Sequence, residues 1–349
     1  MALSTIPTRA LSEQGINFRN LIINGDMSIA QRGTSTSSVT SNGYYACDRF
    51  NFNTNVGTYT ISQVTDAPTG QGFNKSIKVD VTTANASPSA STFVILSQRL
   101  EGQNLQMLKK GTSNAESLTL SFWVKSNKTG TYIVEFYDFD NGRSNNQSYT
   151  INSASTWEKK TITINGDTTG TFDNDNNRSL ELNFWLGAGS DFSSGTLNTS
   201  WNSITQTNRA VGQVNLADST SNYINITGVQ LEVGTSASDF EFLPYDVNFK
   251  RCLRYFEKSF NQGVTPASNI ITNVLFGRRG IIYFKETKRT NPTMTSYASL
   301  GSNSTWHWYS GVFNSVTPTF GVSNNLFSYD LGGYEYTDVY GNWTADAEL

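Results

Sequence analysis

The chain has 349 residues, of which 37% are hydrophobic and 13% aromatic, so its composition allows packed cores and excludes a disordered protein. Charged residues make up only 15%, the formal net charge is −3, and no long basic block occurs, which argues against nucleic acid as a partner. No stretch approaches 18 apolar residues, so we expect no membrane insertion.

Residues 1–19 are polar and weakly patterned, and they lack the apolar core of a signal peptide. We therefore predict that they form an arm outside any domain core. The two cysteines, Cys47 and Cys252, are too few for a disulfide framework. Both are expected to be small buried apolar residues.

From Asn20 onward, short runs that alternate apolar and polar residues follow one another, bounded by Gly, Asn, Ser or Asp. Because no helical periodicity separates them, they predict an all-β fold with an N-terminal jelly-roll β-sandwich over residues 20–245. Residues 145–146 and 173–177 are predicted to be exposed loops. The predicted strands of this domain cover residues 21–23, 44–52, 58–64, 76–81, 92–96, 118–124, 131–137, 160–164, 180–186 and 223–232.

A different periodicity occurs once, in DVNFKRCLRYFEKSF, where apolar residues recur every three or four positions from Phe249 to Phe260. This pattern predicts a short linking helix over residues 246–260. The remainder, residues 261–349, is predicted to be a smaller C-terminal β-sandwich. Its predicted strands cover residues 270–276, 280–284, 305–309, 326–330 and 334–340.

Residues suited to catalysis are scarce. His307 is the single histidine, no G-x-S-x-G motif is present, and one histidine with two distant cysteines cannot build a zinc site. Paired carboxylates, which a glycosidase needs, occur as Asp138 with Asp140 and as Asp173 with Asp175. Aspartates are frequent in turns, and we favour that interpretation for both pairs. The chain is therefore predicted not to be an enzyme.

Aromatic residues on strands are the candidates for sugar contact, because sugar rings stack on flat aromatic faces. Packing in a core or an interface is the favoured alternative for each of them. In the N-terminal domain, Trp123, Trp157 and Trp185 are predicted to be core residues. The candidate ligand-binding residues lie in the C-terminal domain and are Trp306, Trp308, Tyr334 and Tyr336, with Tyr340 close by.

Several segments resemble a jelly-roll domain found in bacteriophage virion proteins of the tail fibre type and in carbohydrate-binding modules. They begin with NLIINGDMSIAQRG (residues 20–33) and end with YINITGVQLEVGTSASDFEFLPYDVNFKRCLRYFEKSF (residues 223–260). SFWVKSNKTGTYIVEFYD, TWEKKTITINGDTTG and LELNFWLGAGSDF lie between them. The resemblance covers about residues 20–260, and GNWTADAEL at 341–349 resembles the close of many phage structural proteins.

The resemblance implies a non-enzymatic structural protein of the virion surface, made and assembled in the host cytoplasm. It further implies a tail fibre or appendage adhesin that contacts host surface glycans, with other virion proteins as partners and a homotrimeric state. A capsid decoration or head-fibre protein is the first alternative, and a glycan-degrading tail enzyme is the second. Arm residues expected to dock onto the particle are Ile6, Pro7, Leu11 and Phe18.

The carbohydrate-binding modules often hold a structural calcium ion between the first and last strands. Asp26 lies in the first of these segments, whereas the last strand reads Asn225-Ile226-Thr227-Gly228-Val229 without an aspartate. The resemblance therefore allows calcium at Asp26, but we expect no metal or other cofactor.

Overall fold

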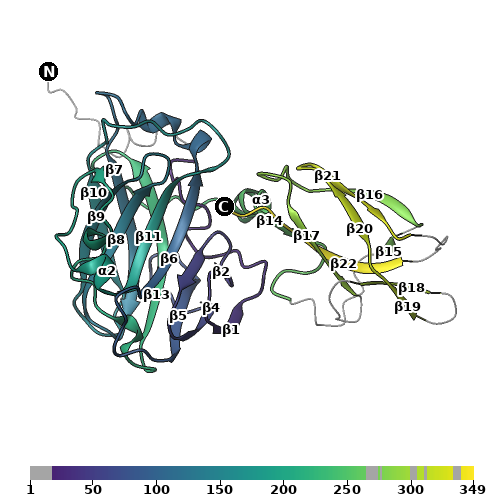
Figure 1. Cartoon of the computed structure of the whole chain (residues 1–349), viewed down its shortest axis with the longest axis horizontal. Helices are drawn as coiled ribbons and strands as arrows, with labels where there is room; N and C mark the ends of the chain where they lie inside the picture. Colours follow the sequence, from purple (N-terminus) through teal and green to yellow (C-terminus); the bar gives the residue numbers. More distant parts are fainter. Residues whose placement is uncertain (1–17, 265–273, 276, 299–304, 310–312, 333–338) are drawn as a thin grey trace, which may run out of the picture.

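The protein is described here by a computed structural model that covers residues 18–264, 274–275, 277–298, 305–309, 313–332 and 339–349. Figure 1 shows two β domains side by side, with the C-terminus between them. The larger domain is a sandwich of two antiparallel sheets, as the all-β prediction requires. Cys47 and Cys252 are both buried and free, as predicted.

The first sheet of the sandwich has six strands and the second has seven. The first sheet contains, in spatial order, β1 (Ser35–Val39), β4 (Thr58–Val64), β5 (Ser76–Thr83), β13 (Tyr223–Val233), β7 (Leu118–Ser126) and β10 (Glu158–Ile164). The second contains β12 (Asn202–Ser203), β9 (Arg143–Ile151), β8 (Gly130–Asp138), β11 (Arg178–Ala188), β6 (Phe93–Glu101), β3 (Asn51–Thr54) and β2 (Gly43–Tyr44).

Alternation along the strands builds the core between these two sheets. Every second side chain of β11 points inward, and the ring of Phe184 lies edge-on to that of Phe122 on β7, with 5.1 Å between the centroids. Phe52 on β3 meets Tyr59 on β4 in the same way at 4.9 Å. Burial of such large rings supplies the main driving force for closing the sandwich.

Glycines in the two end segments of the sandwich allow the chain to close on itself. A side chain at Gly25 would lie 2.1 Å from the carbonyl oxygen of Val229, so the turn after residue 24 can approach β13 only without a Cβ atom. Gly228 has a φ of +62° and interrupts the register of β13 between Thr227 and Gln230. Both glycines belong to the motifs that begin and end the sandwich.

Residues 145–146 were predicted to be an exposed loop, and this prediction is wrong, because they lie in strand β9. Asn145 and Asn146 are buried in the strand, because a long connection covers the outer face of the second sheet. The backbone N–H of Asn146 donates to the carbonyl oxygen of Asn198 at 2.7 Å, and its side-chain amide donates to that of Asn208 at 3.2 Å. The connection contains α2 (Ser190–Ser193), β12 and the 3₁₀ helix η3 (Gln206–Asn208).

The three tryptophans predicted to be core residues differ in environment. Trp185 is fully buried beneath this connection, where it packs with Ile95 and Ile133. Trp123 and Trp157 are half-buried on the outer face of the first sheet, so the core prediction is wrong for both. Trp123 is on the outward side of β7 and Trp157 lies immediately before β10, which the local sequence did not reveal.

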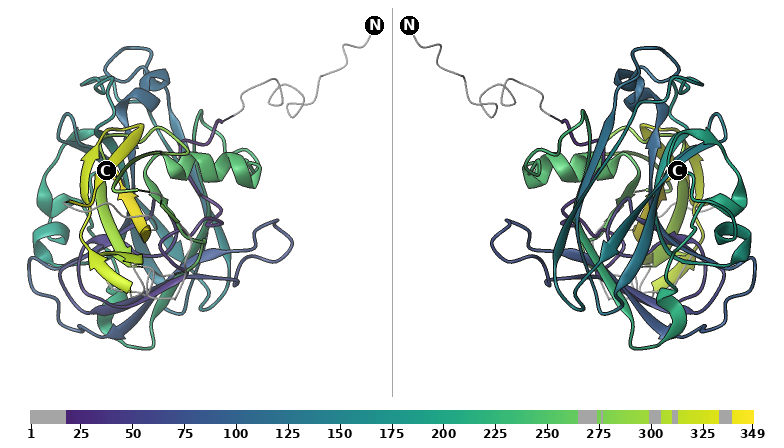
Figure 2. Two further views of the ribbon diagram at one scale, coloured as in Figure 1. Left: turned by 90° about the vertical axis from the view of Figure 1, so that its right-hand side faces the viewer. Right: turned by 90° about the vertical axis from the view of Figure 1, so that its left-hand side faces the viewer.

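The linking helix is shorter than predicted. Helix α3 (Tyr245–Leu253) ends before Phe256, and the next residues form strand β14 (Phe256–Lys258), which pairs with β22 (Val339–Asp346). Helix α3 packs through Cys252 on the segment that contains Ile23 and Ile29, at the flank of the sandwich (Figure 2). The second half of the predicted helix therefore belongs to the C-terminal domain.

The C-terminal domain contains two antiparallel sheets around a small aromatic core that includes Phe327 and Trp343. In one sheet β22 pairs with β14, β15 (Val274–Leu275), β17 (Thr293–Ala298) and β18 (Trp306–Tyr309), which pairs with β19 (Phe313–Val316). The other sheet has the order β16 (Arg279–Tyr283), β21 (Leu326–Asp330) and β20 (Thr319–Val322). Among the described residues, no helix is long and apolar enough to cross a membrane.

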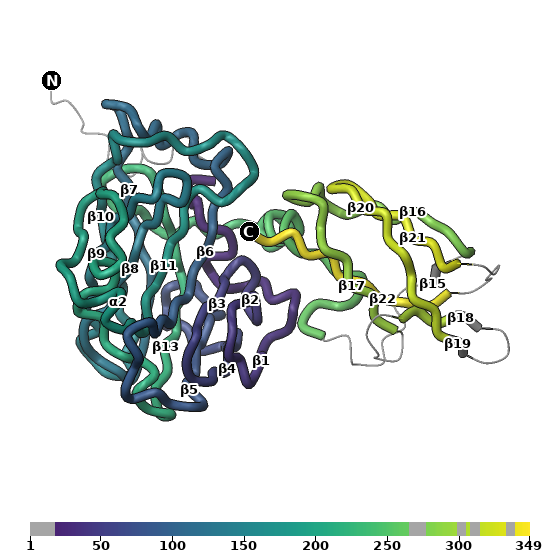
Figure 3. Tube along the Cα trace, viewed as in Figure 1, coloured from purple at the N-terminus to yellow at the C-terminus, as the bar shows by residue number. Residues whose placement is uncertain are grey.

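The last residues return from β22 to the sandwich, as the tube in Figure 3 shows. The buried guanidinium of Arg49 forms an ion pair with Glu348, whose carboxylate also lies 3.3 Å from Arg32. Arg289 of the C-terminal domain donates to the carbonyl oxygens of Ala347 (2.9 Å) and Glu348 (3.0 Å). Polar contacts of this tail therefore connect the two domains.

Candidate functional site

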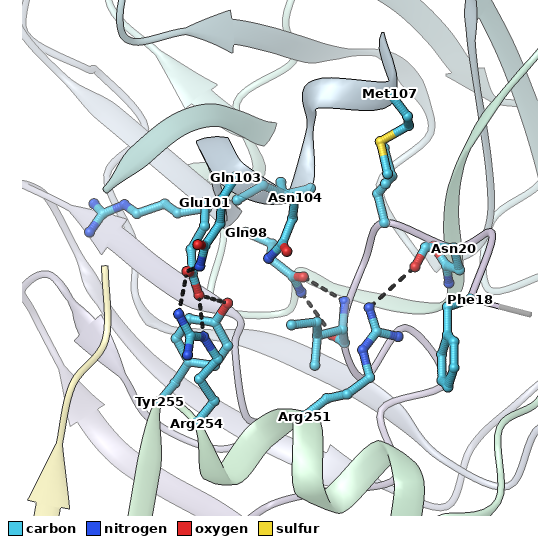
Figure 4. Close-up of a pocket in the computed structure, with 14 residues that line it drawn as sticks. Phe18, Asn20, Gln98, Glu101, Gln103, Asn104, Met107, Arg251, Arg254 and Tyr255 are labelled. Atoms are coloured by element: carbon cyan, nitrogen blue, oxygen red, sulfur yellow. Dashed lines mark hydrogen bonds and ion pairs between the residues drawn. The ribbon is translucent and has the colours of Figure 1, made fainter. Parts of the chain in front are cut away.

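A pocket of about 640 Å³ lies at the flank of the sandwich where three distant parts of the chain meet. Its walls are the segment 18–23, the end of β6 with the 3₁₀ helices η1 (Gly102–Asn104) and η2 (Gln106–Leu108), and residues 251–255 around the end of α3 (Figure 4). Strand β6 and helix α3 hold two of these walls in place.

Glu101, at the end of β6, organises one side of the pocket. It is fully buried and accepts hydrogen bonds from Arg254 Nε (2.8 Å) and Nη2 (2.7 Å), from Tyr255 Oη (2.5 Å) and from Gln103 Nε2 (2.6 Å). Burial alone would raise the pKa of Glu101, but these hydrogen bonds and the charge of Arg254 hold that pKa below its usual range. Glu101 is therefore a neutralised anion that fixes the positions of Arg254 and Tyr255.

Gln98 joins β6 to the segment that forms the opposite wall. Its amide oxygen accepts from the backbone N–H of Ile23 at 2.7 Å, and its amide nitrogen donates to the Ile23 carbonyl at 2.9 Å. Gln98 and Ile23 are both buried, and losing either hydrogen bond would leave a buried polar group without a partner. The wall near Asn20 is thus held to the sheet.

The other side of the pocket presents groups that a ligand can reach. As whole residues, Phe18 is 52% exposed and Met107 is 50% exposed. Arg251 lies beside Phe18 in Figure 4, and its Nη2 donates to the carbonyl oxygen of Asn20 at 3.3 Å. Asn104, on η1, adds an exposed amide. The pocket therefore combines an apolar ring with planar polar groups.

The acidic lining of this pocket does not suit glycoside hydrolysis. Glu101 is the one acidic side chain among the described residues that line it, and Arg254 neutralises its charge. Hydrolysis of a glycosidic bond ordinarily needs two carboxyl groups on either side of the bond. The arrangement suits binding of a ligand better than cleavage of one.

The paired aspartates also have structural surroundings. Asp138 is fully buried, 2.6 Å from the ammonium group of Lys110, and it accepts hydrogen bonds from Asn141. Asp140 accepts from the backbone N–H of Asp173 at 3.0 Å. Asp175 accepts from Asn177 within its own loop. The contacts of Asp140 and Asp175 agree with the turn interpretation. For Asp138 that interpretation is wrong, because this residue ends strand β8 and is buried in an ion pair.

The aromatic candidates of the C-terminal domain do not form a site in the described part of the chain. Trp306 is fully buried, its Nε1 donates to the carbonyl oxygen of Asn342 at 3.0 Å, and its ring contacts Tyr329. This corrects the expectation of a ligand contact, because a buried indole offers no face to a sugar. Trp308 lies in the same strand β18, and Tyr340 is half-buried in β22. Tyr334 and Tyr336 lie outside the described residues.

The docking residues expected in the arm fall mostly outside the description. Ile6, Pro7 and Leu11 are among the residues not described, whereas Phe18 is described and lines the pocket. The backbone N–H of Phe18 donates to Glu241 at 2.9 Å.

The surroundings of Asp26 do not fit calcium. Its Oδ1 accepts from Ser28 Oγ (3.0 Å) and from the amide nitrogen of Asn248 (3.1 Å), and burial raises its pKa. Calcium requires six to eight oxygen ligands. Within the described ranges, no three His, Cys, Asp or Glu side chains are grouped to hold a metal ion. We therefore set aside the calcium allowed by the resemblance.

The C-terminal domain presents a second exposed feature, which local sequence patterns did not single out. The outer face of β16 carries Tyr283, 72% exposed, and Ile281, 60% exposed, beside a hollow of about 700 Å³. An ion pair between Arg279 and Asp330 (2.7 Å) borders the hollow. Alternation along residues 279–283 places both apolar side chains on one face.

No protein-family model matches the chain, and no curated protein matches it. Similar solved structures include the enzymatically active domain of tailspike protein 4 of bacteriophage CBA120, 16% identical, which covers 62% of this chain and 22% of its own, with a TM-score of 0.33. The TmCBM61 module in complex with β-1,4-galactotriose is 13% identical over 62% of this chain and 99% of its own, with a TM-score of 0.31.

A family 11 carbohydrate-binding module from Clostridium thermocellum, in complex with a mixed-linked tetrasaccharide, is 12% identical. It covers 59% of this chain and 98% of its own, with a TM-score of 0.29. The chain thus spans about a fifth of the tailspike structure and almost all of each binding module. Scores this low assign no role to any residue, so the geometry of the pocket must carry the functional argument.

Proposed function

We propose that this protein is a non-catalytic glycan-binding protein and that the pocket beside α3 is its binding site. The observation that carries the proposal is the combination of the half-exposed ring of Phe18 with the amide of Asn104 and the guanidinium of Arg251 in one pocket. A sugar ring offers an apolar face to an aromatic side chain, while its hydroxyl groups bond to amides and guanidinium groups. The single carboxylate, Glu101, is already neutralised by Arg254.

Binding should be measured by isothermal titration calorimetry with oligosaccharides prepared from the host cell surface. Replacing Phe18 by alanine removes the stacking face, and we expect affinity to fall about twofold to tenfold. Phe139→Ala is the matched control, because Phe139 is 45% exposed but lies at the end of β8 beneath Arg178. Equal affinities for the wild type and F18A, with a well-folded variant, would place binding elsewhere.

The absence of catalysis is tested separately. Host polysaccharide incubated with a high concentration of the protein should release no new reducing ends, because the pocket lacks a second carboxylate. Release of reducing ends that is lost in E101Q would instead support a glycan-degrading enzyme.

We further propose that the protein belongs to the surface of a phage virion, as a tail fibre or appendage adhesin with other virion proteins as partners. The resemblance of residues 20–33 and 223–260 to phage jelly-roll domains supports this location. Antibody labelling of intact particles should mark the tail, whereas labelling of the head would favour a capsid decoration or head-fibre protein.

A homotrimer is proposed for the assembled state, since several weak sugar sites together give useful avidity. Sedimentation equilibrium of the purified full chain should give three times the mass of one chain. A stable monomer at micromolar concentration would contradict it.

A further inference from the structure

Arg251 differs from its neighbouring arginines in lacking an anionic partner. Arg254 pairs with Glu101 at 2.7 Å, and Arg19 lies 3.8 Å from Glu232. In the part of the chain that the structure describes, no carboxylate oxygen lies within 4.0 Å of the Arg251 guanidinium, which donates to the carbonyl oxygen of Asn20. A positive charge therefore lines the pocket with most of its donors uncommitted.

The nearby carboxylate of Glu241 cannot fulfil that role as placed. Its two oxygens accept the backbone N–H groups of Phe18 (2.9 Å), Arg19 (3.3 Å) and Asn20 (2.9 Å), which anchor the segment that forms one wall. The charge of Glu241 acts on Arg251 only over a longer distance.

Burial adds to this imbalance. Loss of solvation lowers the pKa of Arg251. The more distant charges that raise this pKa, such as that of Glu241, do not offset the effect of burial. The remaining arginine that lines the pocket, Arg99, is already bonded to Glu181 at 2.6 Å and to the carbonyl oxygen of Leu349. An anion entering the pocket would thus find one guanidinium ready to pair with it.

We propose that this pocket selects anionic saccharides, whose carboxylate or phosphate group pairs with Arg251 while the sugar ring stacks on Phe18. This inference rests on the proposed glycan-binding function and specifies the class of glycan. A planar guanidinium fork matches either anionic group, and hydrogen bonds between charged partners are stronger than neutral ones. Figure 4 shows Arg251 and Phe18 next to each other at the same end of the pocket.

The test compares an oligosaccharide that contains uronic acid with the same oligosaccharide after its carboxyl groups are reduced to alcohols. The full-length protein should bind the acidic form about tenfold to a hundredfold more tightly in calorimetry. This preference should shrink as salt is raised from 50 to about 500 mM. A second pair, a phosphate-substituted oligosaccharide and its dephosphorylated form, shows which anionic group is preferred.

R251Q should abolish the preference, so that the acidic form and the neutral form bind with equal affinity. R279Q removes the same charge from the exposed ion pair on the C-terminal domain and should keep the full preference. If R251Q does not fold, R251K and the salt dependence of the wild type take its place. R251K keeps the charge but loses the fork, so an intermediate preference is expected.

The outcomes separate the two proposals. Equal affinity for charged and neutral members of both pairs would overturn the anionic preference and leave glycan binding in place. Binding of neither member of either pair would overturn the proposed function itself. A preference for the acidic form that persists in R251Q would assign the selectivity to another residue and overturn the role of Arg251.

Discussion

Replacing Glu101 by glutamine keeps the shape of the side chain and removes the charge that holds Arg254 and Tyr255 at the pocket. Removing one partner of a buried ion pair costs about 3–5 kcal/mol when the other charge stays fully buried. The side chain of Arg254 is 29% exposed, so water can take over part of its solvation. We therefore expect E101Q to lower the free energy of unfolding by about 2–3 kcal/mol at pH 7.

The pH dependence gives a second, independent expectation. The pKa of Glu101 is lowered in the folded protein, so near this pKa the folded protein binds fewer protons than the unfolded chain. The stabilisation is therefore fully present above the unfolded pKa of about 4.3 and is lost as the pH falls through the lowered folded value. The difference between the wild type and E101Q should shrink below about pH 4.

Urea denaturation followed by tryptophan fluorescence, from pH 7 to pH 3, measures both effects. E116Q is the matched control, because Glu116 is 37% exposed and pairs with the 54% exposed Lys109. An exposed pair of this kind contributes about 0.5 kcal/mol or less. A loss as small in E101Q as in E116Q, or a difference that does not change with pH, would refute the role assigned to Glu101.

K110M should lower the free energy of unfolding by about 3–5 kcal/mol, because it leaves the fully buried Asp138 without its cation, and an unchanged melting temperature would contradict this. Burial lowers the pKa of Lys258 to about 8, so the folded state loses its proton earlier than the unfolded chain. Stability should then rise between about pH 8 and pH 10.5 in the wild type, and chemical denaturation should show a smaller rise in K258M. F184A should cost about 3–5 kcal/mol in thermal denaturation, whereas F139A at the surface should cost less than about 1 kcal/mol.

Strands with clear alternation could be predicted from the sequence, and β4, over residues 58–64, matches its prediction. Strand β9 could not, because its polar residues resemble a loop. The reason is tertiary: the connection that contains α2 and η3 covers Asn146 and supplies carbonyl oxygens for its hydrogen bonds. A buried asparagine is tolerated in a strand only when such partners are present.

The end of α3 illustrates the same limit. Residues 254–260 continue a helical periodicity, yet Phe256–Lys258 form β14 because β22, about 85 residues later in the chain, offers an unpaired edge. The alternation of Phe256 and Lys258 with Glu257 was compatible with either structure. Long-range pairing decided between them.

The sequence by itself determined the class of the protein: apolar residues alternate with polar ones over short runs, and that period of two can bury a face only in sheets. Only the tertiary structure decided the pocket, because Phe18, Asn104 and Arg251 lie far apart along the chain. Their meeting depends on which strands pair and on where α3 packs, and those choices follow from contacts between distant residues.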